Sequence, residues 1–331
     1  QDMEEYMYKG LMASLGDPYS AYYTSEEYEE LNAETTGSYK GIGVVMQQEA
    51  DTGEVKILRC YEGGPGAKAG LLPEDVLIQV NGENVAGMEL SEVVDLVKSS
   101  EGDTAILTIS REGESDYLEI QVPLEEVNIP VVEYEMLEDN IGYISIYEFT
   151  EQTVPQYETA FEELQSQGME RMIIDVRNNP GGLLTSVCDL LEDMLPEGLI
   201  VYTEDKEGER QEYTCDGENE LDMPLVVLVN GNSASASEIF AGAIQDYGTG
   251  TLVGTTTFGK GIVQSLIPFT DGSAVKTTTA KCYTPSGRCI HGTGIEPDVE
   301  VELTKGLEQK SVLTYEEDNQ LQTAIDTVKG L

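Results

Sequence analysis

The sequence predicts a mixed protein of the α/β (α+β) class, in which a small strand-rich module is inserted into a larger core and helices flank both. Short strands alternate with glycine turns from Gly37 to about Leu124. After Pro130 the pattern changes to strands followed by amphipathic helices, which is typical of an α/β core. The 331 residues suffice for two or three modules with cores of their own. We expect four segments: an N-terminal helical segment (1–36), the small module (37–124), the main core (125–305) and a C-terminal helical segment (306–331).

The first two segments contain one helix each by their apolar spacing. Apolar residues from Tyr8 to Leu15 recur at helical intervals, and Gly16-Asp17-Pro18 ends that helix. An acidic, tyrosine-rich stretch follows to Thr36. In the small module a helix is expected over 90–98, and strands over 41–45, 55–58, 76–80, 104–109 and 117–122.

The main core is expected to alternate strands with helices. Strands are predicted at 141–147, 172–176 and 225–229, and helices over 154–164, 183–194 and 237–247. A hairpin then joins Ile262–Phe269 to Ala274–Tyr283, and Leu321 to Val328 form a final amphipathic helix. No internal repeat is visible.

The charge excludes some classes of partner. There are 63 acidic and 18 basic residues, for a formal charge of −45, so phosphate backbones and anionic lipid surfaces would be repelled. We expect no nucleic-acid partner and read the charge mainly as a source of solubility. No apolar run approaches the roughly 18 residues that cross a bilayer. Because the chain begins at Gln1, we expect that an upstream segment, such as a signal peptide or membrane anchor, has been removed.

The five cysteines form no C-x-x-C pair, so neither a zinc knuckle nor a thioredoxin-like site is supported. Cys282 and Cys289 flank a turn-rich segment and could pair in an oxidising compartment, while free thiols are the default.

Ser235 is the first candidate for chemistry. It lies in Asn232-Ser-Ala-Ser-Ala-Ser-Glu238, between a predicted strand and a predicted helix. Unpaired backbone N–H groups gather at a helix N-terminus, which suits a nucleophile whose substrate becomes an oxyanion. Serine is also a preferred helix cap, and this segment alone does not separate the two interpretations.

Lys260 is the second candidate. It lies in Phe258-Gly-Lys-Gly-Ile-Val-Gln264, and flanking glycines allow close approach and partial desolvation, which lowers a lysine's pKa. If a strand begins near Lys260, Gln264 faces the same side and could hold the amine. A surface turn lysine is the alternative.

Two further segments give weaker evidence for a catalytic role. Asp175-Val-Arg-Asn-Asn-Pro-Gly-Gly182 offers a strand, a tight turn and exposed N–H groups suited to an oxyanion hole, although a plain turn fits as well. The single histidine, His291, follows the serines. A Ser–His–Asp triad would need it as the base, which the spacing does not exclude and no other feature supports, so we expect a structural loop residue. A trypsin-like protease would need a histidine upstream of the serine, and none exists.

Together these segments resemble the carboxyl-terminal processing proteases, also called tail-specific proteases, over nearly the whole chain. The segments that match in family order are Leu15–Ser20, Gly41–Gly43, Gly64–Leu71, Val80–Gly82, Asn179–Gly182, Ser233–Glu238, Phe258–Gly261 with Gln264, Tyr283–Gly287 and Gly294–Asp298. The resemblance implies a core like those of ClpP and crotonase with an inserted PDZ domain, and a bacterial protein acting outside the cytoplasm. It implies no cofactor and no metal.

The resemblance also implies roles for residues. Ser235 is the nucleophile, Lys260 the general base and Gln264 its orienting partner. The oxyanion hole comes from backbone N–H groups of Gly181, Gly182 and Ala236, while Asp246 has a structural role. Lys260 takes the serine proton, an ester forms and water hydrolyses it.

The PDZ domain is expected to bind a substrate's terminal carboxylate near Gly41, Ile42 and Gly43. The partners implied are proteins or peptides with accessible C-termini. The terminal helices are candidates for a homodimer interface, as in relatives, and core packing explains them equally well. The alternative function is a non-catalytic peptide-binding protein on the same fold.

Overall fold

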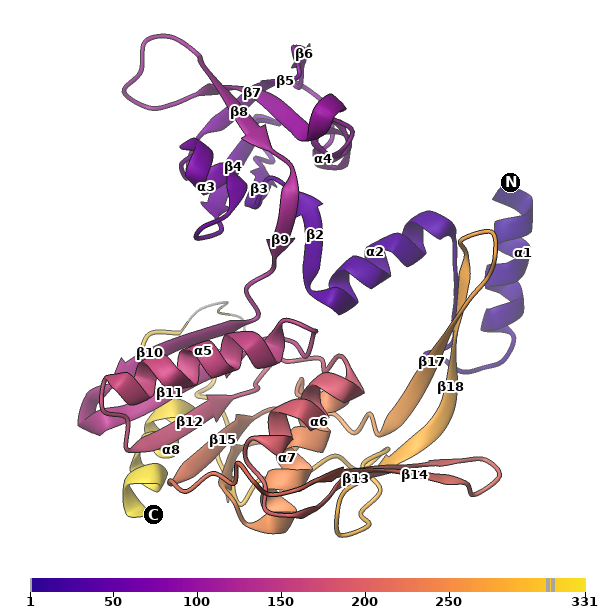
Figure 1. Cartoon of the computed structure of the whole chain (residues 1–331), viewed down its shortest axis with the longest axis vertical. Helices are drawn as coiled ribbons and strands as arrows, with labels where there is room; N and C mark the ends of the chain where they lie inside the picture. The colour runs from indigo at the N-terminus through magenta and orange to yellow at the C-terminus, as the bar shows by residue number, and fades with distance from the viewer. Residues whose placement is uncertain (1, 308–309, 311–312) are drawn as a thin grey trace. The chain divides into compact units, whose positions relative to one another are not determined.

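The computed structural model describes residues 2–307, 310 and 313–331, and the chain forms two compact units (Figure 1). The larger unit contains Gln1–Thr36 and Val131–Leu331, and the smaller contains Gly37–Pro130. Within the described part of the chain, no helix combines the length and apolar character needed to cross a bilayer.

A six-stranded sheet forms the centre of the larger unit. Its order is β10-β11-β12-β15-β16-β19, and every neighbouring pair is parallel except the antiparallel pair of β10 and β11. The strands are β10 (Val132–Leu137), β11 (Ile141–Ile146), β12 (Arg171–Asp175), β15 (Leu225–Val229), β16 (Thr251–Gly254) and β19 (Val299–Glu300).

Helices cover both faces of this sheet. On one face α8 (Asn319–Gly330) packs against Ile173, Val226 and Leu228. On the other face lie α5 (Thr153–Ser166), α6 (Leu184–Glu192) and α7 (Ala236–Tyr247), shown side by side in Figure 1. Because both faces are covered, all five residues of β15 are buried, as the uninterrupted apolar run from Leu225 to Val229 predicts.

A second sheet extends from the larger unit. Its order is β1-β18-β13-β14, and β17 also pairs with β18. Its strands are β1 (Ala21–Tyr23), β13 (Gly198–Asp205), β14 (Arg210–Cys215), β17 (Ile262–Pro268) and β18 (Ala274–Tyr283). The expected hairpin of β17 and β18 is present, whereas β1, β13 and β14 were not predicted from the sequence.

The smaller unit is a sheet of order β3-β4-β5-β7-β8, to which β6 adds, with a separate ribbon of β2 and β9. Its strands are β2 (Ser38–Gly41), β3 (Val44–Gln48), β4 (Val55–Cys60), β5 (Val76–Val80), β6 (Glu83–Asn84), β7 (Thr104–Ser110), β8 (Leu118–Pro123) and β9 (Glu125–Asn128). Its helices are α3 (Pro65–Ala69) and α4 (Leu90–Lys98), and α4 has the predicted bounds. In the structure β9 belongs with this unit because it pairs with β2, so the unit continues to Pro130.

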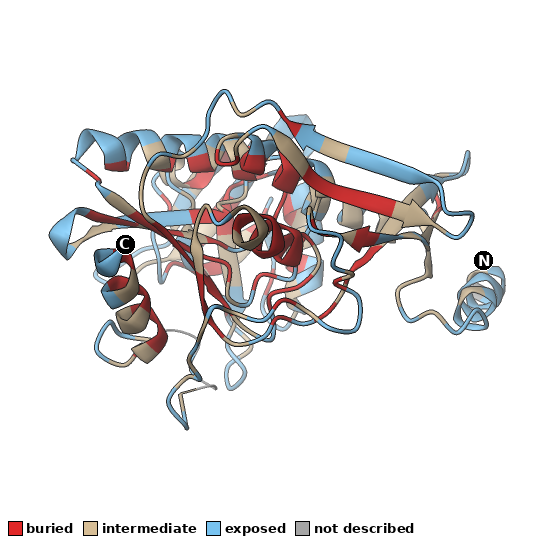
Figure 2. Cartoon of the chain, turned by 90° about the horizontal axis from the view of Figure 1, so that it is seen from below, coloured by how far each residue is buried: buried red, intermediate tan, exposed pale blue. Residues whose placement is uncertain are grey.

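The two terminal helices differ in burial. Figure 2 shows buried residues along the strands and helices of the core, and exposed ones over the N-terminal helix. α1 (Asp2–Ala13) exposes Met3, Tyr6, Met7 and Leu11, whereas α8 buries Leu321, Ala324, Ile325 and Val328. Core packing therefore accounts for the C-terminal helix but not for α1. The helix α2 (Ser25–Thr36) has no buried residue, and it was not predicted as a helix.

Candidate active site

Two loops meet at the carboxyl edge of the central sheet. β12 and β15 are parallel neighbours, with Asp175 opposite Leu228, so the segments that follow them emerge side by side. Ser233 Oγ donates to the Val176 carbonyl, and the Ala234 N–H donates to the Asn179 carbonyl. Ligands of parallel sheets commonly bind at such an edge. The structure thus brings together the two segments that the sequence proposed for the nucleophile and the oxyanion hole.

Ser235 lies directly before α7 in a strained backbone conformation. Its φ of 57° and ψ of −113° are values that residues other than glycine rarely adopt. The side chain is half-buried, and Ala236 and Ser237 behind it are buried. A serine on a strained turn between a strand and a helix is also the arrangement that exposes the nucleophile hydroxyl in α/β-hydrolases.

Gly181 approaches Ser235 so closely that no other residue fits there. A Cβ on Gly181 would lie 2.7 Å from Ser235 Cβ and 2.9 Å from Ala236 N, at a φ of +108°. Gly182 is equally constrained, because its Cβ would lie 2.1 Å from the Phe149 carbonyl oxygen. Gly181 therefore allows its backbone to lie against the start of α7, and Gly182 allows its backbone to lie against Phe149.

The N–H groups of this turn differ in availability. Gly181 N–H donates to Asn179 Oδ1 at 2.8 Å, so it is already engaged in this conformation. Over residues 2–307 no acceptor is found for the N–H of Gly182 or of Ala236. These two N–H groups are therefore available to donate to a ligand.

Lys260 is half-buried, and its environment favours the neutral amine. Burial lowers the pKa of Lys260 below its usual value of 10.5, and the positive charge of Lys276 lowers it further. The negative charge of Glu238 acts in the opposite direction without reversing the shift. Within the described part of the chain the amine forms no hydrogen bond with Ser235, and it lies 5.0 Å from the centroid of the Tyr19 ring.

Within the described residues, the Gln264 side chain forms no hydrogen bond with Lys260. β17 begins at Ile262, so Lys260 lies just before the strand and not within it. A bulge between Val263 and Gln264 also breaks the alternation that would place Lys260 and Gln264 on one face. The Gln264 amide donates to the Ile262 carbonyl at 3.4 Å instead.

Glu238 is the residue of this site whose importance the sequence did not reveal. Its side chain is fully buried, and Oε2 accepts the N–H of Ser235 at 2.9 Å and the N–H of Lys260 at 2.8 Å. Oε1 accepts the Thr257 hydroxyl and the Gly259 N–H, both at 2.6 Å. One carboxyl group therefore holds the backbones of both candidate residues. A charged residue on the otherwise buried first turn of α7 was the available signal.

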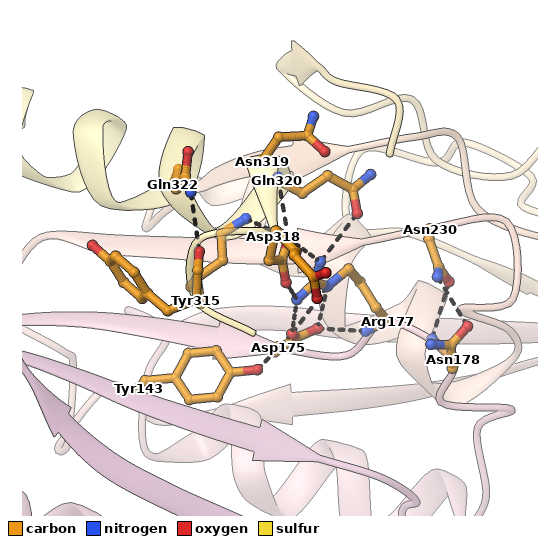
Figure 3. A network of polar contacts seen from close by, with 12 residues as sticks. Tyr143, Asp175, Arg177, Asn178, Asn230, Tyr315, Asp318, Asn319, Gln320 and Gln322 are labelled. Atoms are coloured by element: carbon orange, nitrogen blue, oxygen red, sulfur yellow. Dashed lines mark hydrogen bonds and ion pairs between the residues drawn. The ribbon is translucent and has the colours of Figure 1, made fainter. Parts of the chain in front are cut away.

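A buried ionic network holds the other loop (Figure 3). Arg177 Nη2 pairs with Asp175 at 2.6 Å and with Asp318 at 2.8 Å. The Tyr143 hydroxyl donates to Asp175, and Asn178 exchanges hydrogen bonds with Asn230 beside the network. Asp318 caps α8 by accepting from the N–H groups of Gln320 and Leu321. The network thus connects the start of α8 to the segment that leads to Gly181.

Within the described residues, the Asp246 and His291 side chains form no hydrogen bond or ion pair with Ser235 or Lys260. Asp246 pairs with Arg288 and accepts the Ser286 N–H, contacts that hold the loop after β18. His291 is exposed, and its backbone faces Gly261. All five cysteines are free thiols.

In the smaller unit Gly41 is the last residue of β2, and Ile42 and Gly43 connect β2 to β3. β3 is an edge strand of its sheet, and α4 packs beside it. The Ile42 carbonyl accepts from Gly66 and the Gly43 carbonyl from Tyr61, which fixes the turn. An unpaired strand edge beside a helix is a place where a peptide can add as a further strand.

Comparison with known proteins gives matches over most of the chain. Residues 140–301 match peptidase family S41, and residues 56–111 match the PDZ domain. A carboxyl-terminal-processing protease of Synechocystis is 35% identical over 97% of this chain and 75% of that protein. A probable CtpA-like serine protease of Staphylococcus epidermidis is 36% identical over 89% of this chain, which spans only 60% of that relative's length. The solved photosystem II D1 C-terminal processing protease is 32% identical, with a TM-score of 0.54 over 91% of this chain and 83% of that one.

The fold and these matches define a class, that of serine peptidases with a PDZ domain. Within it, the chain belongs to peptidase family S41, that of the carboxyl-terminal processing proteases.

Proposed function

We propose that this chain is a serine endopeptidase that cleaves unfolded or C-terminally tagged proteins through Ser235 and Lys260. The observation that carries the proposal is the position of Glu238 Oε2, which accepts the N–H groups of both residues. A serine at a helix start and a partly desolvated lysine, held at one buried atom, are the parts that a Ser–Lys hydrolase needs.

The chemistry is acyl transfer. Neutral Lys260 takes the Ser235 hydroxyl proton while Oγ bonds to the substrate carbonyl carbon. Gly182 and Ala236 donate to the resulting oxyanion, and the Lys260 ammonium protonates the leaving amine. Water then cleaves the ester, with Lys260 again as base. Rotation of the lysine side chain away from Tyr19 brings the amine to the serine, and Gln264 orients it there.

Casein cleavage by the wild type, Ser235→Ala and Lys260→Ala tests the proposal. Each substitution should reduce cleavage more than about a thousandfold while leaving the melting temperature nearly unchanged. Lys281→Ala, an exposed lysine of β18, is the matched control and should retain activity. Full activity in Lys260→Ala would discard the dyad, and full activity in Ser235→Ala would show that Ser235 is not the nucleophile. A wild type that cleaves nothing would leave only a peptide-binding protein.

The PDZ unit is proposed to select substrates by their C-termini. A tail pairs with the free edge of β3 while its carboxylate meets backbone N–H groups near Gly41, Ile42 and Gly43. Amidating the C-terminus of a peptide substrate should therefore lower kcat/KM by about tenfold or more, as expected for a lost charge-assisted hydrogen bond. Equal rates for the free acid and the amide would remove this role.

We also propose that the protein acts outside the cytoplasm and that a second copy packs on α1. The second part is supported by the exposed face of Met3, Tyr6, Met7 and Leu11, which core packing leaves uncovered. Sedimentation at micromolar concentration should give a dimer that Tyr6→Glu with Met7→Glu dissociates, and a monomeric wild type would contradict it. Fractionation of the producing bacterium tests the location, and recovery with the cytoplasmic proteins would contradict it.

A further inference from the structure

The N-terminal segment places an aromatic ring on the amine that serves as the base. Lys260 Nζ lies 5.0 Å from the centroid of the Tyr19 ring, although more than two hundred positions separate the residues in sequence. Within the described ranges this amine has no hydrogen bond or ion pair, so its specific contact is the cation–π contact with the Tyr19 ring. A cation at this distance from a ring face is attracted by the ring's quadrupole, and a neutral amine is not.

The position of Tyr19 is fixed by a polar turn. Asp17 Oδ2 accepts the hydroxyls of Ser20 at 2.6 Å and Thr278 at 2.7 Å, and Oδ1 accepts the Tyr19 N–H at 3.1 Å. The chain then enters β1, which pairs with β18 from Ala21 to Tyr23. The turn is thus tied to β18, the strand that pairs with β17, and β17 begins at Ile262, shortly after Lys260.

We propose that Tyr19 is a positioning residue of the active site, whose ring binds the ammonium form of Lys260 and so sets the pH at which the amine becomes available to Ser235. The proposal rests on the Ser235–Lys260 function stated above. The ammonium must release one proton to solvent before it can accept the serine proton, and the ring stabilises only the state before that release.

Every charged group that faces Lys260 enters this balance. Burial and Lys276, from β18, favour the neutral amine, while Glu238, from α7, favours the ammonium. Tyr19, from the N-terminal segment, also favours the ammonium form. Removing the ring while keeping apolar cover should therefore shift the balance toward the neutral amine.

The test is the pH dependence of kcat/KM for wild type, Tyr19→Leu and Tyr19→Phe, since its acid limb reports the base of the free enzyme. In Tyr19→Leu the limb should move to lower pH by about 0.5 to 1 unit, because a cation–π contact is lost and apolar cover remains. In Tyr19→Phe the limb should stay, because the ring remains. An unmoved limb in Tyr19→Leu, or an equal shift in Tyr19→Phe, overturns the proposal.

Tyr23→Leu is the matched control, because Tyr23 covers Lys276 at 5.2 Å instead of Lys260. It should leave the limb unchanged, and a shift equal to that of Tyr19→Leu would show a general effect of the segment and overturn the assignment.

A second measurement of the Lys260 pKa needs no activity. In the Ser235→Ala background, ¹³C NMR of labelled lysine, assigned with Lys260→Ala, should give the same downward pKa shift for Tyr19→Leu. If the NMR pKa shift is seen but the wild type cleaves nothing, the Tyr19–Lys260 contact is supported and the protease function is discarded. If the wild type cleaves substrate but no NMR pKa shift is seen, the protease function is supported and the role of Tyr19 is discarded.

Discussion

The Glu238 carboxyl group takes no part in the proposed bond changes, yet it touches both residues that do. Its four donors are the N–H groups of Ser235, Gly259 and Lys260 and the Thr257 hydroxyl. An oxygen that accepts two N–H groups in a buried site is difficult to replace, since each unsatisfied buried donor costs about 1 to 3 kcal/mol. We infer that this side chain fixes the distance between the nucleophile and the base.

The substitution Glu238→Gln tests this role. The amide NH₂ would face two N–H or O–H donors instead of accepting from them, so the free energy of unfolding should fall by about 2 to 4 kcal/mol. The turnover number should fall further than stability accounts for, because the backbones of Ser235 and Lys260 lose their common anchor. Urea unfolding and kcat at a temperature where the variant is folded measure the two effects. Glu296→Gln removes one exposed charge and should change neither. Unchanged kcat in Glu238→Gln would show that the anchor is unnecessary.

At the scale of elements, α8 is bound to the central sheet by more than its apolar face. The Asp318 carboxylate pairs with Arg177 through both oxygens while it caps α8 (Figure 3). Burial raises the pKa of Asp318, but its hydrogen bond and attraction to Arg177 lower it more, so the net pKa lies below the usual 3.8. Ionised Asp318 therefore contributes stability at neutral pH.

Asp318→Asn should weaken this attachment in a pH-dependent way. A carboxyl group whose pKa is lowered by folding stabilises the protein above its unfolded pKa of about 3.9, and this contribution is lost as the pH falls through the folded value. The variant should be less stable than wild type by about 2 to 4 kcal/mol at pH 7. The difference should shrink steadily below about pH 4. Urea unfolding at pH 7, 4 and 3 measures it, and a constant difference would show that the ionised form is not what matters. Asp326→Asn, on the exposed side of α8, is the control and should change stability by less than about 0.5 kcal/mol.

The elements were predicted well where local pattern decides them. α4 and the strand Leu225–Val229 have the predicted bounds, because a helical apolar period and an uninterrupted buried run are strong signals. The strands β1 and β14 were not predicted, because their residues are mostly half-buried or exposed and give no clear period. β13 buries Ile200 to Thr203 and was also not predicted, because a short apolar run does not by itself distinguish a strand from a buried helix. β1 matters for the proposed function, since it holds the turn that carries Tyr19 beside Lys260.

For the molecule as a whole, the formal charge of −45 is the dominant property. Acidic side chains far outnumber the cations that could pair with them, so like-charge repulsion opposes folding at low ionic strength. Raising NaCl from about 20 mM to 0.5 M shortens the screening length severalfold and should raise the melting temperature. Each kcal/mol of repulsion removed should add about 2 to 4 °C. Calorimetry in the two salt concentrations measures this, and a melting temperature that falls with salt would show that ion pairs outweigh the repulsion.

The amino-acid sequence by itself determined the class of fold, the small inserted module and the segments that carry Ser235, Lys260 and Gly181-Gly182, because each depends on local spacing or on short segments in a fixed order. Only the tertiary structure placed Glu238 between the serine and the lysine, tied Arg177 to Asp318, and put the Tyr19 ring on the amine. These contacts join residues that are distant along the chain or on different elements. Their geometry depends on strand pairing and a bulge in β17, which local residue patterns do not specify.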